Sequence, residues 1–208
     1  MTSVGRAELP SRAIEHDVAT DDRAGGGQLL PGQPDMWAFV LFEAFVFTSY
    51  FTVYVIHRAQ NPESFLASQA RLSLRVGVFN TLLLLGSSWS VACCVQAARA
   101  RAFRAALARV YLSMFLGLVF LVTKVFEWTT EISSGFTFTT DEFSSFYYFL
   151  TSIHFIHLLI GFIALSIAVH QIYNPGRRSQ QVIETCATYW HTVDFLWILF
   201  FALLYVMR

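Results

Sequence analysis

The sequence has 208 residues, of which 55% are apolar, 16% aromatic and only 13% charged, and its mean hydropathy is +0.52. Soluble globular domains carry about 25% charged residues, so this composition excludes a disordered chain and argues against an ordinary water-soluble domain. Cations and anions balance at 14 each, and the cations are scattered along the chain. A nucleic-acid-binding protein normally concentrates basic residues on one face. The composition therefore favours a membrane protein and no nucleic-acid partner.

Five stretches satisfy the requirement of roughly 20 mostly apolar residues for a bilayer-crossing helix. They are residues 36–56, 76–95, 105–126, 146–172 and 186–207. Residues 1–35 are instead polar and end in a run rich in Pro and Gly. We therefore predict an all-α polytopic membrane protein, with a polar cytoplasmic tail at 1–35 and a transmembrane domain at 36–208.

The arginines predict the orientation, because Lys and Arg gather on the cytoplasmic side of membrane proteins. The tail and the second and fourth connections hold nine arginines, and the other side holds four. The third connection, 129–145, has no Lys or Arg and carries three acids. We expect the N-terminus in the cytoplasm and the C-terminus outside.

In the first span, Glu43 begins a helical stripe that continues through Phe47, Tyr50, Tyr54 and His57. A carboxylate surrounded by aromatic rings is poorly solvated, so we expect Glu43 to be protonated or hydrogen-bonded. It is a candidate for proton handling. The alternative is a neutral side chain that only forms a hydrogen bond between helices.

The third span ends with Lys124, Glu127 and Trp128. Lys124 and Glu127 are i,i+3 neighbours and can pair on one face, and the Lys124 ammonium can meet the Trp128 ring. We expect a snorkelling ion pair near the outer boundary. Its role in this interpretation is structural.

Histidines mark the last two spans. His154 and His157 are i,i+3 neighbours that could begin a haem or copper site, but such a site also needs ligands from facing helices. His191 is the only other deeply placed histidine, so we favour hydrogen-bonded structural histidines. His191 and Asp194 are also i,i+3 neighbours, and we expect the carboxylate to orient the ring in a structural pair.

Five motifs in order resemble subunit III of the haem-copper oxidases. They are WAFVLFE at 37–43, FNTLLLLGSS at 79–88, FEW at 126–128, TSIHFIHLLIGFIAL at 151–165 and ATYWHTVDFLWILFFALLY at 187–205. Ser152 and Phe155 stand where this family commonly has Gly. Lys124 and the aromatic run 146–149 resemble the branch that is encoded with nitric oxide reductases.

The resemblance implies five helices in a two-plus-three bundle around a lipid-filled cleft. It also implies a non-catalytic subunit without catalytic, cofactor or metal residues of its own, in a bacterial inner membrane. Haem and copper would reside in partner subunits I and II, and phospholipids would occupy the cleft. Glu43 is the implied proton-handling residue, and five polar side chains are structural or lipid-cleft candidates: Glu127, His154, His157, His191 and Asp194.

Three further hypotheses remain open beside a cytochrome c oxidase subunit that supports proton uptake and the stability of its catalytic partner. The chain could belong to a quinol oxidase or be an accessory or assembly protein for nitric oxide reduction. It could also be an independent haem-binding membrane protein, for which the sequence offers few ligands.

Overall fold

The computed structural model describes residues 34–207, and this part of the chain is helical without a strand. Five long helices follow one another, with a short helix after the first and a π-helical turn after the last. Their bounds are α1 (Pro34–Gln60), α2 (Pro62–Gln69), α3 (Leu74–Arg99), α4 (Phe103–Ser133), α5 (Glu142–Tyr173), η1 (Pro175–Arg177), α6 (Gln180–Phe201) and η2 (Ala202–Val206). Each long helix contains a segment long and apolar enough to cross a membrane. The prediction of an all-α, five-span membrane protein is confirmed.

The helices extend beyond the predicted apolar spans, and polar side chains cap the starts of α5 and α6. Asp141 begins α5 with a capping box, in which its carboxylate accepts from the Ser144 backbone N–H at 2.7 Å. Gly135 follows α4 with φ of +84°, a left-handed conformation that Gly adopts readily. The predicted tail, 1–35, lies outside the described residues except for its last two, which already belong to α1.

The helix α2 lies in a connection for which no helix was predicted. Its Phe65 is buried against Tyr54 and Phe143, and the Gln69 amide donates to the Leu204 carbonyl at 3.0 Å. Eight residues are too few for a clear hydrophobic period, so this helix depends on its tertiary contacts.

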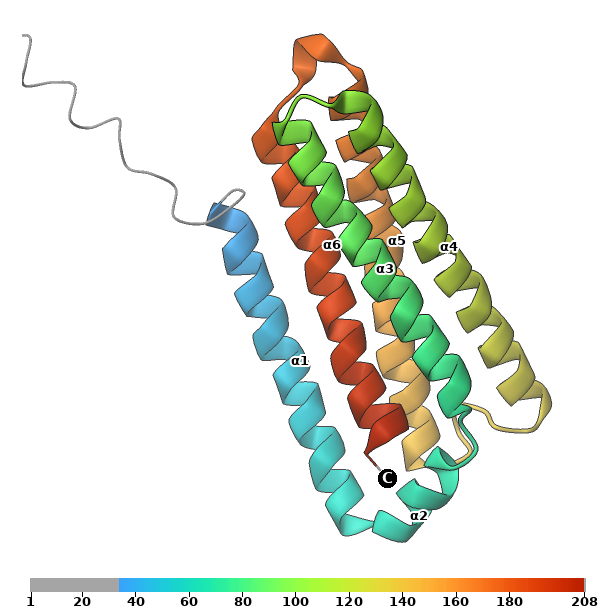
Figure 1. Cartoon of the computed structure of the whole chain (residues 1–208). Coiled ribbons are helices and arrows are strands. Elements are labelled where there is room, and N and C mark those ends of the chain that lie inside the picture. The colour runs from blue at the N-terminus through green and yellow to red at the C-terminus, as the bar shows by residue number, and fades with distance from the viewer. Residues whose placement is uncertain (1–33, 208) are drawn as a thin grey trace, which may run out of the picture. The chain divides into compact units, whose positions relative to one another are not determined.

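The helices α3, α4, α5 and α6 pack against one another, and α1 lies along the edge of this group beside α6 (Figure 1). The first residues of α1 lie at the same end of the bundle as the α3–α4 and α5–α6 connections, and the C-terminus lies at the opposite end (Figure 1). The predicted two-plus-three grouping around a lipid cleft stays a prediction.

Large apolar side chains cover the outside of the bundle. In α1, Leu41, Phe42 and Phe45 are 69%, 63% and 73% exposed. Water-soluble monomers rarely expose contiguous apolar patches of this kind, whereas lipid chains solvate them well. The exterior therefore fits a protein surrounded by lipid.

Trp190 fills the centre of the four-helix group. A Cβ atom on Gly161 in α5 would lie 2.9 Å from its ring, and one on Gly117 in α4 would lie 3.1 Å from it. The indole N–H donates to Ser87 in α3 at 3.0 Å, and Ser87 also bonds Ser113 in α4 at 2.7 Å. Small and hydroxylated residues thus let four helices approach a single ring, as is common in membrane bundles.

Replacing Gly161 with Ala should overpack this centre. The new methyl group would press on the buried Trp190 ring, and overpacking costs about 1–3 kcal/mol, which exceeds the gain of about 1 kcal/mol from the helix propensity of Ala. Thermal unfolding in detergent should show a lower midpoint for Gly161→Ala.

Gly86→Ala is the matched control, since its Cβ would meet only Leu116 at an ordinary 3.5 Å. Equal midpoints for the two variants would contradict the proposed packing around Trp190.

Candidate functional site

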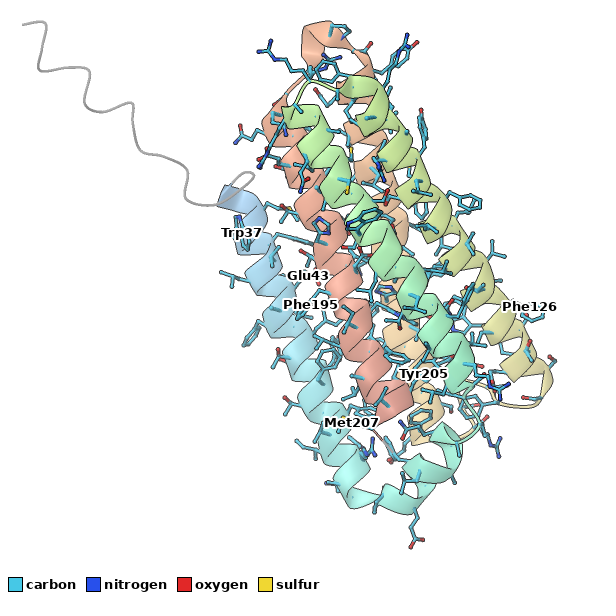
Figure 2. The ribbon with its side chains drawn as sticks, in the orientation of Figure 1. Trp37, Glu43, Phe126, Phe195, Tyr205 and Met207 are labelled. Atoms are coloured by element: carbon cyan, nitrogen blue, oxygen red, sulfur yellow. The ribbon has the colours of Figure 1, made fainter. Side chains whose placement is uncertain are left out.

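The Glu43 side chain lies on the side of α1 that faces the other helices (Figure 2), and it contacts His157 of α5. Its Oε1 is 3.4 Å from Nε2 of His157, and these side chains are 12% and 18% exposed. The other ring nitrogen of His157, Nδ1, lies 2.9 Å from the Ile153 carbonyl. Since a carbonyl can only accept, Nδ1 carries a proton. Nε2 and Glu43 therefore face each other either as a neutral imidazole and a carboxylic acid, or as an imidazolium and a carboxylate.

The helical stripe predicted from Glu43 faces the protein interior. Phe47 and Tyr54 are buried, and Tyr50 and His57 are partly buried. Phe47 packs edge-on against the His157 ring at 5.8 Å, and the Tyr54 hydroxyl donates to the Leu203 carbonyl at 3.2 Å. Glu43 is therefore held at the interface of α1 with α5 and α6, away from bulk lipid.

Lys124 and Glu127 form the predicted ion pair, with Nζ 3.1 Å from Oε2. The expectation that this pair snorkels at the boundary is wrong, because Lys124 is only 1% exposed and Glu127 only 6%. Lys124 points into the bundle, where its ammonium lies over the rings of Tyr147, Trp197 and Tyr205 at 4.7–5.5 Å. These rings, from α5, α6 and the C-terminal turn, take the place of the expected Trp128.

Two tyrosines complete this buried cluster, and neither was predicted to contact Lys124. Lys124 donates to the Tyr147 and Tyr205 hydroxyls at 3.0 and 2.9 Å, and these hydroxyls donate to Glu127 at 3.1 and 2.5 Å. Figure 2 shows Tyr205 at the C-terminal end of the last helix. The one feature of the sequence that pointed to such partners was the lysine itself. A single lysine among apolar residues of a span requires polar groups from facing helices.

His154 and His157 do not converge on a common point. His157 faces Glu43, whereas His154 is fully buried among the rings of Phe120, Trp197 and Phe200. Neither ring nitrogen of His154 has a hydrogen-bond partner among the described residues. Within residues 34–207, no three His, Cys, Asp or Glu side chains gather in a way that could hold a metal ion.

The expected His191–Asp194 pair is absent from the described structure, so that expectation is wrong. The His191 ring instead shares a hydrogen bond with Ser88 of α3, with Nδ1 2.6 Å from the hydroxyl. The Asp194 carboxyl is 3% exposed, and its oxygens have no hydrogen-bond partner in the part of the chain that the structure describes. The same Ser88 hydroxyl lies near this carboxyl. A contact between two helices, α3 and α6, therefore replaces the expected pair within α6. The spacing of residues along one helix does not reveal such contacts.

The structure thus defines a multi-pass helical membrane protein whose buried polar residues join neighbouring helices. The family model described as cytochrome c oxidase subunit III matches residues 33–208. The chain therefore belongs to the cytochrome c oxidase subunit III family, and the predicted membership is confirmed.

Several curated relatives resemble the chain over most of its length. Cytochrome c oxidase subunit 3 of Synechocystis is 29% identical and covers 96% of this chain and 88% of its own. Cytochrome bo(3) ubiquinol oxidase subunit 3 of Pseudomonas aeruginosa is 25% identical and covers 93% and 90%. The heme-copper oxidase subunit I+III of Aeropyrum pernix is 24% identical, over 83% of this chain and 22% of that longer protein.

Breaking the Lys124–Glu127 pair should strongly destabilise the bundle. Removing one partner leaves the other buried and uncompensated, which costs about 3 kcal/mol or more. We expect Lys124→Met and Glu127→Gln each to lower the free energy of unfolding in detergent. The double variant should lose at least about 1 kcal/mol less than the sum of the two losses, because the groups interact directly. Simple additivity would contradict the pairing.

Asp194→Asn should lower the free energy of unfolding much less than Glu127→Gln, which also replaces a carboxyl with an amide. No cation pairs with Asp194 in the described residues, so the amide breaks no ion pair and keeps the shape of the side chain. We expect a change below about 1 kcal/mol in detergent unfolding, against about 3 kcal/mol for Glu127→Gln. Equal losses would show that Asp194 has an ionic partner.

Proposed function

We propose that this chain is the non-catalytic subunit III of a bacterial respiratory haem-copper terminal oxidase of the cytochrome c oxidase type. In aerobic electron transport it would support proton uptake into catalytic subunit I and the stability of that subunit. Haem and copper would lie in subunits I and II, and phospholipids in the predicted cleft. Family membership implies association with haem-copper oxidase catalytic subunits in the membrane.

The observation that carries the proton-related role is the Glu43–His157 contact. Because Nδ1 of His157 already donates to a carbonyl, one proton is shared between Nε2 and Glu43 in either protonation state of the pair. A carboxyl and an imidazole within 3.4 Å inside a membrane can accept and release that proton. Intramembrane ionisable residues commonly mark such pathways. The alternative is a fixed hydrogen bond that only attaches α1 to α5.

Two histidines elsewhere in the bundle have surroundings that suit a structural role. The rings of His154 and His191 face aromatic side chains and Ser88 respectively, not a shared point. Glu127, His154, His157, His191 and Asp194 would thus serve the structure or the lipid cleft.

The proposed orientation places the N-terminus in the cytoplasm and the C-terminus outside. Arg99, Arg104 and Arg178 belong to the bundle end from which α1 starts, whereas the α4–α5 connection at the opposite end carries Asp141 (Figure 1). This asymmetry is the one expected of an inner-membrane protein.

Subunit III of a quinol oxidase is the second candidate, favoured by the relative whose name is that of a ubiquinol oxidase subunit. An accessory role in nitric oxide reduction is the third, and it rests on the sequence resemblance of Lys124 and the 146–149 run.

Co-purification separates these candidates. A tag on the full chain should recover a haem-copper catalytic subunit from membranes in mild detergent, and deletion should impair oxygen consumption. Impaired nitric oxide turnover with normal respiration would support the accessory role. A Soret band with stoichiometric haem in the isolated chain would overturn the non-catalytic assignment.

Glu43→Gln should leave assembly intact and lower sustained oxygen turnover by about threefold, which is roughly 0.7 kcal/mol in the activation barrier. The amide keeps the size of the side chain but cannot exchange the shared proton. Oxygen consumption of the purified complex over many turnovers measures this effect.

Glu142→Gln is the matched control, because Glu142 also lies beside a histidine, His57 at 3.5 Å, but is 52% exposed at the end of the bundle. Unchanged turnover over prolonged assays of Glu43→Gln would reduce the Glu43–His157 contact to packing.

A further inference from the structure

Two grooves lie side by side at the N-terminal end of α3. The larger has a volume of about 500 Å³ and runs between α3 and α4. The smaller has about 350 Å³ and follows the neighbouring face of α3. Arg75 and Phe79 line both grooves. Since residues four apart stand one above the other on a helix, these side chains form a ridge with a groove on each side.

The lining changes from charged to apolar along the helix axis. Arg75 lies at the first turn of α3 and Glu131 at the last turn of α4, both at the ends of their spans. Farther into the spans the lining consists of Phe79, Val122 and Phe126, which are 49%, 61% and 72% exposed. Phe126 is seen on the outer face of α4 (Figure 2). This gradient matches an amphiphile with its head at the span ends and its tail along the helices.

The charges at the head end are of both signs. Among the ion pairs of residues 34–207, none includes Arg75 or Glu131, although Arg71 and Lys124 attract the Glu131 carboxylate from a longer distance. The neighbouring Glu127 is already bonded to Lys124, Tyr147 and Tyr205. A guanidinium binds phosphate strongly, and a carboxylate favours an ammonium group and opposes a second anion. The end of the groove therefore complements a zwitterionic head with one phosphate and one amine.

We propose that one amine-bearing zwitterionic phospholipid, of the phosphatidylethanolamine class, binds at this double groove. Its phosphate meets Arg75, its ammonium meets Glu131, and its two acyl chains lie on the two sides of Phe79. A single lipid with two acyl chains would account for two apolar grooves that share Arg75 at their charged end. The site lies between adjacent helices α3 and α4 and does not involve α1 or Glu43, so it is independent of the proposed proton role.

Native mass spectrometry of the full chain, with whatever subunits it retains, tests this site. After delipidation and return of defined lipids, we expect one phosphatidylethanolamine per chain. Arg75→Gln and Glu131→Gln should each weaken its retention by about tenfold, since each removes a charge-assisted hydrogen bond. Phosphatidylcholine, whose quaternary ammonium cannot donate, and anionic phosphatidylglycerol should bind about tenfold more weakly. Arg104→Gln, at an exposed arginine at the other end of α4, is the control.

A second pair of variants tests the acyl-chain positions. Val122→Trp should fill the larger groove and displace the lipid, whereas Val125→Trp lies on the same helix outside both grooves and should leave it bound. Both valines are exposed, so neither exchange disturbs the core.

Equal retention by wild type, Arg75→Gln and Val122→Trp would overturn the proposal. Equal binding of the anionic lipid, or a partner helix found in the groove of the assembled complex, would also overturn it. Failure to recover a catalytic subunit would contradict the proposed function, but it would leave the lipid count of the chain measurable.

Discussion

The arrangement of α4, α5 and the C-terminal turn depends on the contacts of the buried Lys124 ammonium group. A cation buried in a membrane-spanning bundle requires an anion and further hydrogen-bond acceptors, because neither water nor lipid chains can supply them. Glu127, Tyr147 and Tyr205 meet that requirement from three segments of the chain. The tyrosine hydroxyls also donate to Glu127, so the cluster constrains where each segment can lie. The C-terminal π-helical turn is thereby attached to the interior of the bundle.

The same principle extends to the centre of the four-helix group. Helices in lipid gain little from hydrophobic burial against one another, so close packing and polar contacts hold them together. Trp190 sits against Gly117 and Gly161 and donates to Ser87, and Ser88 bonds His191. Many large apolar side chains also cover the exterior, in contrast to the pattern in a soluble bundle.

Helix α1 differs from the others because it lies at the edge of the bundle and carries one acid deep in its span. Its contact with His157 joins it to α5 through a carboxyl and an imidazole 3.4 Å apart. The buried Lys124 cluster is saturated with partners, whereas Glu43 has one long contact and remains partly exposed. This contrast separates a group suited to stability from a group suited to proton exchange, and it supports the role proposed for a subunit of the oxidase family.

The amino-acid sequence by itself determined the five spans, the family, the inward stripe of α1 and the pairing of Lys124 with Glu127. These features depend on hydrophobic length and on helical neighbours at i+3 and i+4, which any α-helix enforces. Only the tertiary structure decided that Glu43 meets His157, that two tyrosines enclose Lys124, that Ser88 rather than Asp194 bonds His191, and that His154 points away from His157. The physical reason is that contacts between helices depend on the rotation and depth of each helix against its neighbours. Many side chains set these jointly, and spacing along one segment does not encode them.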